Sequence, residues 1–261
     1  MMPPKPGRIA CFLRPVGMIW MSICLHWEAL IQVVRQEGIA GFTCLQQIRD
    51  IASAKLLSNT ASGFIAFENT TIVPSLVKAA SGVVLELGPG PGNQIHRYDT
   101  SAIDFVYGVD PNPYFKENIN FIVSSDDDLR DKYKLLVCGT EDSDILRSEG
   151  ITEGSLDTVL SIQTLCAVKD PKNVMKEVWK LLKPGGKFIF WEHGWSRNRL
   201  TMIEQALLEP VWSTFVGCHL TRSVLAEILD AGEWENVQDI EEPNEPLTLL
   251  PRIQGVLVKK G

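Results

Sequence analysis

The chain has 261 residues, is 45% hydrophobic and 22% charged, and carries a net charge of −7. This apolar share excludes a mainly disordered chain, and the length allows one full domain with roughly 60 residues left for an extension. The acidic balance provides no overall positive field for nucleic acid, so we expect no nucleic-acid partner. No two of the six cysteines have the spacing of a zinc or redox motif, which predicts reduced thiols and no metal site.

The N-terminal 35 residues are apolar but interrupted. The runs Ile9–Leu13 and Val16–Trp27 are separated by Arg14 and Pro15, so neither reaches the roughly 20 residues of a spanning helix. The split run is also a poor signal peptide. Two interpretations remain. Residues 9–34 form either an amphipathic helix in peripheral contact with a membrane or a helix packed on the domain core, and the interruptions favour packing.

The rest of the chain follows an α/β pattern. Residues 36–81 look helical, and we expect breaks at Gly38, Gly41 and Gly63. Short apolar runs then predict strands at Val83–Leu87, Phe105–Val109, Tyr133–Cys138, Leu156–Ile162 and Lys187–Trp191. Helices are expected over Pro171–Leu182 and residues 197–230, with two late strands near Val237–Ile240 and Ile253–Val258. Strands that alternate with helices predict a parallel sheet covered on both faces.

The strongest local signal is a glycine-rich turn directly after the first predicted strand. Its glycines are Gly88, Gly90 and Gly92. Glycine permits positive φ and lets a ligand approach the backbone. The spacing differs from the dinucleotide fingerprint GxGxxG, and the two prolines between the glycines lack N–H donors. The turn therefore suits a ligand other than a polyphosphate, and the neighbouring Glu86 would attract an ammonium or sulfonium group.

A second acid lies where the next strand ends. Asp110 follows Gly88 by about 20 residues, the distance at which doubly wound folds place an acid that binds ribose hydroxyls. An Asp-Pro turn is the alternative for Asp110 alone, but the preceding glycine turn makes ribose binding the better interpretation.

Four motifs together resemble the class I S-adenosylmethionine-dependent methyltransferases. They are Glu86–Gly92, Asp110, Gly154–Ser161 and Leu181–Lys187. The resemblance covers about residues 80–195 and implies a doubly wound, seven-stranded, mostly parallel, Rossmann-like sheet. We expect an N-terminal helical extension or cap over residues 1–80 and a methyltransferase domain over 81–261, with a helical insertion at about 197–230.

Further segments are similar to the methyltransferase-like 7 group, which contains membrane-associated alkyl thiol methyltransferases. They are Val109–Phe115, Thr164–Val168, Trp191–His193, Leu208–Trp212 and Gly217–Arg222. This resemblance implies a methyltransferase that acts on a small lipophilic acceptor through a sulfur or oxygen nucleophile, as enzymes of secondary metabolism do. It also implies a location in the cytoplasm or on the cytosolic face of an internal membrane. The alternatives are N- or C-methylation of a lipid or natural product, and a cyclase that binds the cofactor without transferring its methyl group.

The resemblance also implies the roles of the site residues toward S-adenosylmethionine. Glu86 and the glycine turn hold its amino-acid end, Asp110 takes the ribose, and the following dipeptide flanks the adenine. After the third strand, Glu141 is favoured over Thr140 for the adenine amine. The expected cofactor-binding residues are Glu86, Gly88, Gly90, Gly92, Asp110, Pro111, Asn112, Thr140, Glu141, Ser161 and Gln163.

Two histidines are candidates for the acceptor side. His193 ends the fifth predicted strand, where α/β folds bind ligands, and His219 lies between two predicted helices. Histidine can orient an acceptor or take its proton near neutral pH. A hydrogen-bonded structural role is the alternative for each. Cys166 and Cys218 are expected to be small buried apolar side chains.

Overall fold

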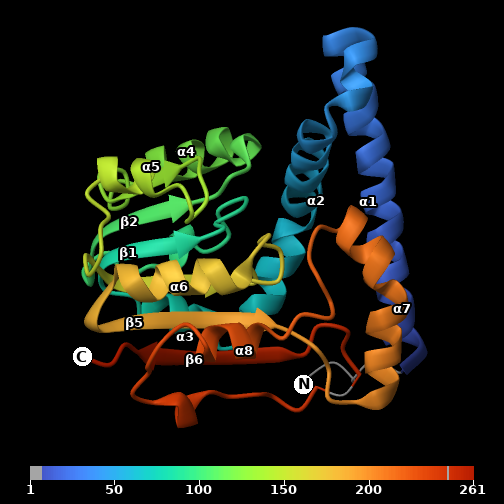
Figure 1. Ribbon diagram of the computed structural model, residues 1–261. Coiled ribbons are helices and arrows are strands. Elements are labelled where there is room, and N and C mark those ends of the chain that lie inside the picture. Colours follow the sequence, from blue (N-terminus) through green and yellow to red (C-terminus); the bar gives the residue numbers. More distant parts are fainter. Residues whose placement is uncertain (1–7, 246) are drawn as a thin grey trace.

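The computed structural model describes residues 8–245 and 247–261. Its centre is a six-stranded sheet with the order β3-β2-β1-β4-β5-β6, in which β6 is antiparallel to β5 and the other pairs are parallel (Figure 1). The strands are β1 (Gly82–Leu87), β2 (Ile103–Val109), β3 (Tyr133–Leu136), β4 (Leu156–Ile162), β5 (Leu182–His193) and β6 (Arg252–Val258). The predicted α/β fold with a doubly wound, mostly parallel sheet is confirmed.

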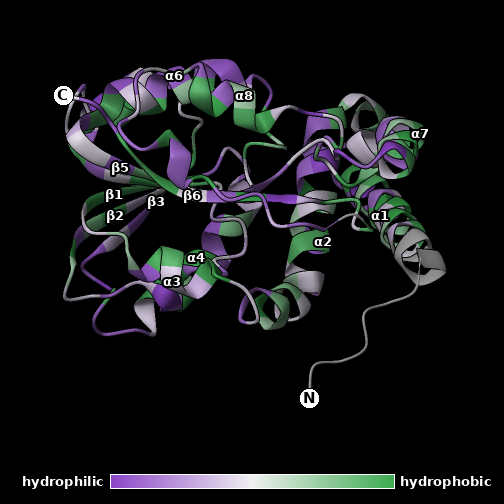
Figure 2. Cartoon of the chain, turned by 90° about the horizontal axis from the view of Figure 1, so that it is seen from below, coloured by the Kyte–Doolittle hydropathy of each residue, from purple (hydrophilic) through white to green (hydrophobic). Residues whose placement is uncertain are grey.

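Helices cover both faces of this sheet. The α-helices are α1 (Arg8–Glu37), α2 (Leu45–Glu68), α3 (Val73–Lys78), α4 (Lys116–Ser124), α5 (Ser143–Ser148), α6 (Pro171–Leu181), α7 (Arg199–Phe215) and α8 (Val224–Leu229). The described residues also form the short 3₁₀ helices η1 (Gly38–Thr43), η2 (Ile95–Arg97), η3 (Pro113–Phe115) and η4 (Val237–Asp239). Figure 2 shows α6 and α8 on one side of the sheet and α3 and α4 on the other.

The period-two alternation of strand side chains builds two cores, one on each face. Leu85 of β1 and Phe188 of β5 face the core under α6 and α8. Val84 and Ile189, one residue away in each strand, face the core under α3 and α4. Because both faces of the central strands are buried, their sequences are almost continuously apolar, and this is why the pattern identified them.

The seventh strand expected near Val237–Ile240 is absent from the described residues. The segment forms η4 and then a single bridge between Glu241 and Gln254. The Asn236 side chain explains the difference. Its Nδ2 donates to the Val256 carbonyl at 2.8 Å and its Oδ1 accepts from the Val258 amide at 2.9 Å. These bonds occupy positions on β6 that a neighbouring strand would otherwise pair with.

The predicted break at Gly63 is wrong, because α2 continues through it to Glu68. A glycine inside a helix costs only about 1 kcal/mol relative to alanine. The packing of the buried side of α2, which includes Ile51 and Leu56, offsets that cost. The break at Gly38 is confirmed, since α1 ends at Glu37 and Gly38 has a φ of +64°.

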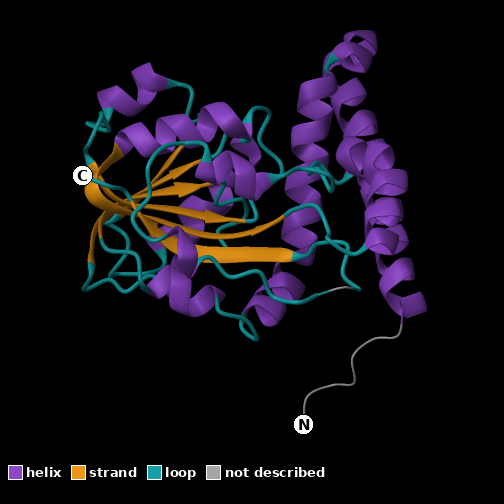
Figure 3. Cartoon of the chain, turned by 60° about the horizontal axis from the view of Figure 1, so that its bottom comes forward, coloured by secondary structure: helices purple, strands orange, loops and turns teal. Residues whose placement is uncertain are grey.

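Helices α1, α2 and α7 form a helical layer beside the carboxyl ends of the parallel strands (Figures 1 and 3). Leu25, Ala29 and Val33 of α1 are buried against α2. The same helix contacts α7, where the Ser22 hydroxyl donates to the Phe215 carbonyl. The expectation that this segment packs on the protein is therefore met on one side of α1.

The other side of α1 is exposed. Its Val16, Trp20 and Trp27 side chains are 49%, 67% and 63% accessible. By length and composition, the stretch Pro15–Thr43 is apolar enough to cross a membrane, and 22% of its most apolar window is buried in the protein. A core helix of a soluble protein and a signal sequence have the same length and composition.

Candidate active site

The glycine turn has the backbone that the sequence predicts. Gly88, Gly90 and Gly92 have φ values of +56°, +52° and +87°. A Cβ on Gly88 would lie 2.6 Å from the Thr164 side chain, so this position also needs glycine for its close contact with the loop after β4. A Cβ on Gly90 would meet only Leu57 of α2, at 3.8 Å. The turn thus lies between the end of β4 and the helical layer.

Asp110 is fixed at the tip of β2, next to this turn. Its Oδ2 accepts from the Gly90 amide at 3.2 Å and its Oδ1 from the Asn112 amide at 2.9 Å. Burial raises the pKa of Asp110 to about 6, although these two amides favour the ionised form. Each carboxylate oxygen keeps a free lone pair, so Asp110 can accept from two further hydroxyls.

The two residues after Asp110 differ in their surroundings. Pro111 is exposed. Asn112 is buried, and its Oδ1 accepts from the Tyr114 amide at 3.0 Å as the cap of η3. Its Nδ2 donates to the Asp50 carbonyl of α2 at 2.9 Å. Asn112 therefore connects the helical layer to the tip of β2.

Glu86 is the second buried acid of the site. The Tyr133 hydroxyl donates to its Oε2 at 2.9 Å, across the intervening strand β2. Gly108 of β2 makes this reach possible, because a Cβ there would lie 2.4 Å from the Tyr133 hydroxyl oxygen. Burial raises the pKa of Glu86 to about 7, against the lowering effect of the Tyr133 hydrogen bond. The sequence analysis missed Tyr133, although a lone glycine in an apolar strand is a sign of such a close approach.

These two buried carboxyls fit S-adenosylmethionine. No basic side chain stabilises the charged form of either carboxyl in the described structure, so a ligand that brings a positive charge or hydroxyl donors would supply the missing partners. The cofactor carries an ammonium group, a sulfonium group and a ribose diol. The open backbone at Gly90 leaves room for a ligand to approach.

The candidate cofactor-binding residues after β3 and β4 differ in their surroundings. Thr140 is buried, while the Glu141 side chain turns back over Gly139. The Ser161 hydroxyl donates to Glu192 Oε1 at 2.7 Å, so its side chain is already engaged. Gln163 has a φ of +57°, which is unusual for a residue other than glycine and is typical of functional sites.

Gln163 lies next to a buried ion pair that the sequence did not reveal. Its Nε2 lies 3.5 Å from Glu68 Oε1, and the Arg97 guanidinium binds Glu68 Oε2 at 2.6 Å. Gln94 donates to the same carboxylate at 3.1 Å. Because Glu68 ends α2, this contact fixes the helical layer to the end of β4 and to the segment after the glycine turn.

The two histidines have different surroundings. His193 is 2% exposed, its Nε2 lies 3.6 Å from Cys218 Sγ, and its Nδ1 has no hydrogen-bond partner in the described structure. His219 is 39% exposed at its side chain, and its Nδ1 lies 2.6 Å from Glu209 Oε1. His193 therefore faces a thiol, and His219 is held by Glu209 of α7.

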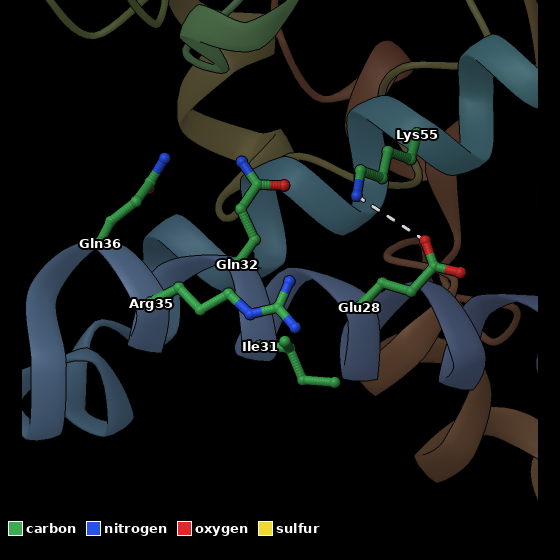
Figure 4. A pocket seen from close by; sticks show the side chains of 6 residues that line it. All are labelled: Glu28, Ile31, Gln32, Arg35, Gln36 and Lys55. Carbon is green, nitrogen blue, oxygen red and sulfur yellow. Dashed lines mark ion pairs between the residues drawn. The ribbon is translucent and has the colours of Figure 1, made fainter.

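Two hollows mark the surface around these elements. The larger, of about 550 Å³, is an open groove between α1 and α2, and all of its lining residues come from these two helices (Figure 4). An ion pair of 3.7 Å between Glu28 and Lys55 crosses it. The smaller, of about 370 Å³, is lined by residues 194–198, 242–245 and 251–253. Because its lining begins directly after His193, the smaller hollow lies next to the carboxyl end of β5.

Comparison with known proteins identifies the family of the chain. A methyltransferase domain family matches residues 85–190, which span the glycine turn, Asp110 and β4. Strand order, buried acids and family match together define the class as S-adenosylmethionine-dependent methyltransferases of class I. Thiol S-methyltransferase TMT1B of Rattus norvegicus is 32% identical over 181 residues, which cover 67% of this chain and 70% of that protein. The chain belongs to the family of methyltransferases that includes TMT1B, and its cofactor is S-adenosylmethionine.

Solved structures with the same fold include other methyltransferases. An O-methyltransferase family protein from Burkholderia thailandensis gives a TM-score of 0.59 at 16% identity and covers 94% of this chain and 72% of that one. N-methyltransferase NodS from Bradyrhizobium japonicum, in complex with S-adenosyl-L-homocysteine, gives 0.51 at 12% identity and covers 76% and 88%. These identities show the shared fold alone.

Proposed function

We propose that this methyltransferase acts on the sulfur of a small lipophilic thiol. The similarity to thiol S-methyltransferase TMT1B carries this proposal, because it extends over 181 residues, well beyond the methyltransferase domain of residues 85–190. The cofactor motifs do not indicate which acceptor the enzyme methylates. The shared sequence outside them therefore supports a thiol.

We assign the cofactor contacts to the two buried acids and the glycine turn. Asp110 accepts from the ribose hydroxyls, and Glu86 lies where it balances the positive charge of the amino-acid end. Pro111, Asn112, Thr140 and Glu141 are assigned to the adenine side, and Ser161 and Gln163 to the side of the methyl group. When bound, the cofactor supplies a methyl group on a positively charged sulfur.

The protein then contributes alignment and exclusion of water. A thiol loses its proton close to neutral pH, so little chemical assistance is needed beyond placing the sulfur in line with the methyl group. His193 is assigned to the acceptor side, where it positions the acceptor together with the thiols beside it. His219 stays a second candidate, held by its contact with Glu209.

We also propose that the enzyme works at the cytosolic face of an internal membrane. The exposed apolar side chains of α1 lie in a layer with α7, which exposes a row of its own. That row consists of Leu200, Ile203, Leu207 and Val211. Contact of these faces with lipid would bring the strand ends close to the phase in which lipophilic thiols dissolve.

The acceptor is tested by comparing matched compounds. Purified enzyme is given S-adenosylmethionine with alkyl thiols and with the alcohols of the same chains, and S-adenosylhomocysteine formation is measured. We expect thiols to react at least about tenfold faster, because their anions are available near neutral pH. We also expect KM to fall as the chain lengthens. An alcohol or amine as the better acceptor would contradict the assignment to sulfur.

A further inference from the structure

Three side chains that are distant in sequence meet next to the carboxyl ends of β4 and β5, where we propose that the acceptor binds. Cys166 follows β4, His193 ends β5, and Cys218 lies in the loop after α7. Their Sγ and ring nitrogen atoms all lie within 4.8 Å of one another. Cys166 and His193 are buried and Cys218 is half-buried. No short sequence motif links them, so spacing alone cannot reveal this cluster.

We propose that Cys166, His193 and Cys218 form a three-ligand site for a thiophilic divalent cation of the Zn²⁺ type. Zinc binds sulfur at about 2.3 Å and imidazole nitrogen at about 2.0–2.1 Å in a tetrahedron, which places the two ligand atoms about 3.6 Å apart. The distance from Cys218 Sγ to His193 Nε2 is 3.6 Å. Soft thiolate and imidazole ligands in this number are the donor set that zinc prefers.

The surrounding contacts hold the ligands in place. The His219 amide donates to the Cys166 carbonyl at 2.9 Å, which joins the two loops that carry the thiols. The Trp212 indole N–H donates to Cys218 Sγ at 3.1 Å, a bond that a thiolate accepts well. Arg222 donates to the Leu165 carbonyl at 3.2 Å and fixes the loop on which Cys166 lies. The Trp212 indole uses one lone pair of Cys218 Sγ. The other bonds order the ligand side chains and leave free the lone pairs that a metal would need.

The charge balance of the cluster agrees with metal binding. A divalent cation would deprotonate both cysteine thiols on binding. Two thiolates and one divalent cation sum to zero charge, which suits a buried location.

Three protein ligands leave one tetrahedral position open, as in catalytic zinc sites. If the acceptor is a thiol, as proposed above, its sulfur is the natural fourth ligand, because a metal-bound thiol is deprotonated outright. The acceptor proton then leaves to solvent on binding, and the thiolate attacks the methyl carbon as the carbon–sulfur bond of the sulfonium breaks. This step depends on the proposed function, whereas the metal site itself does not.

Cobalt provides a direct test of the site, with a readout independent of activity. The full chain, stripped with a chelator and kept reduced, is titrated with Co²⁺ alone. We expect one Co²⁺ per chain, a thiolate-to-cobalt charge-transfer band and the visible bands of tetrahedral cobalt, all removed by Zn²⁺. Cys166→Ser and Cys218→Ser should each weaken the charge-transfer band, and His193→Gln should weaken binding at least about tenfold. Cys138→Ser, at another buried cysteine, is the matched control and should change nothing.

Two results of the cobalt titration would overturn the metal site. One is the absence of a charge-transfer band in the wild type, and the other is a band that persists in the double variant Cys166→Ser/Cys218→Ser. Should the variants fail to fold, alkylation of the wild type decides. Zn²⁺ should protect Cys166 and Cys218 from labelling but leave the exposed Cys24 reactive. Unchanged labelling, or a Cys166–Cys218 disulfide formed in the presence of Zn²⁺, contradicts the proposal.

A further experiment tests the metal site and the proposed thiol acceptor independently of each other. An alkyl thiol added to the cobalt form should shift the charge-transfer band, while the alcohol of the same chain should not. Full thiol methylation by metal-free enzyme would overturn the fourth-ligand step and leave the proposed function intact. A cobalt site in an enzyme that methylates no thiol would overturn the proposed function and leave the metal site intact.

Discussion

At the scale of single residues, the proposed cofactor site centres on two acids, Glu86 and Asp110. Both are buried, both accept hydrogen bonds from neighbouring elements, and both have a pKa raised by burial. In the absence of a ligand, these carboxyls are therefore a source of instability that a ligand with donors and positive charge removes. The site is arranged to be completed by its cofactor.

Replacement of Asp110 by alanine should weaken cofactor binding. The variant loses two charge-assisted hydrogen bonds to the ribose, each of ~1.5–3 kcal/mol before compensation, so affinity should fall at least ~10-fold. Isothermal titration calorimetry with S-adenosylmethionine measures the change. Asp104→Ala, at an exposed position of the same strand, is the control. Unchanged affinity of Asp110→Ala for S-adenosylmethionine would contradict the assignment of Asp110 to the ribose hydroxyls.

The same acids predict a pH dependence of stability. The folded-state pKa of Glu86 is about 7 and that of Asp110 about 6, both above the unfolded values. The folded protein therefore holds protons that the unfolded chain has lost, and stability falls as pH rises from about 4 through 7. Glu86 alone accounts for up to about 3 kcal/mol of this fall.

Thermal melts of the cofactor-free protein between pH 5 and 8 measure this effect. The melting temperature should decrease across that range, and Glu86→Gln should flatten the decrease, since the amide carries no titrating proton. Glu117→Gln, at an exposed glutamate, should leave the slope as it is. A wild-type melting temperature that rises with pH in this window would contradict the raised pKa values.

The sequence predicted these two acids because their spacing from the glycines is fixed by strand geometry. It could not predict Tyr133, whose contact with Glu86 passes over Gly108 in an intervening strand. It also missed the Glu68–Arg97 ion pair, since nothing local links the end of α2 to η2. Side chains that meet across several elements leave little trace in spacing.

At the scale of elements, the two faces of the helical layer have different surroundings. One side of α1 packs on α2 and α7, and the opposite side presents Trp20 and Trp27 to the surroundings. Tryptophan on an exposed helix face is typical of contact with the membrane interface. The layer is thus both part of the folded protein and a candidate lipid-binding surface.

Replacement of both tryptophans should separate these roles. Trp20→Ser/Trp27→Ser removes several kcal/mol of apolar burial in lipid, so vesicle-bound protein should fall at least about tenfold in flotation with phosphatidylcholine vesicles. Its melting temperature should stay close to that of the wild type, because exposed positions contribute little to stability. Phe121→Ser, at an exposed aromatic residue on α4, should keep wild-type flotation. Equal flotation of the two variants would argue against contact through α1.

Element prediction was reliable where one face or both faces of a strand are buried, as in β1, β2 and β4. It was wrong at Val237–Ile240, where an asparagine side chain takes the place of a backbone ladder. The fifth strand begins at Leu182, earlier than the predicted Lys187, and it contains a bulge, with Leu182 paired to Leu156 and Lys187 to Thr158. Local pattern cannot distinguish such a bulge from a turn.

For the whole molecule, the strand ends and the helical layer come together at one edge. The carboxyl ends of β1, β2, β4 and β5 face the layer of α1, α2 and α7 (Figure 3). The division into an extension over residues 1–80 and a methyltransferase domain over 81–261 stays a prediction. Contacts of α2 with Asn112 and Gln163 mean that the first part is tied to the site of the second.

The central claim is that the methyl group of S-adenosylmethionine ends on a thiol sulfur. It is tested by supplying cofactor with a deuterium-labelled methyl group and a long-chain alkyl thiol, and by measuring both products by mass spectrometry. The account predicts a methyl sulfide that carries the whole label, formed in a one-to-one ratio with S-adenosylhomocysteine. Cofactor that binds but remains methylated while the acceptor is rearranged or untouched would contradict it.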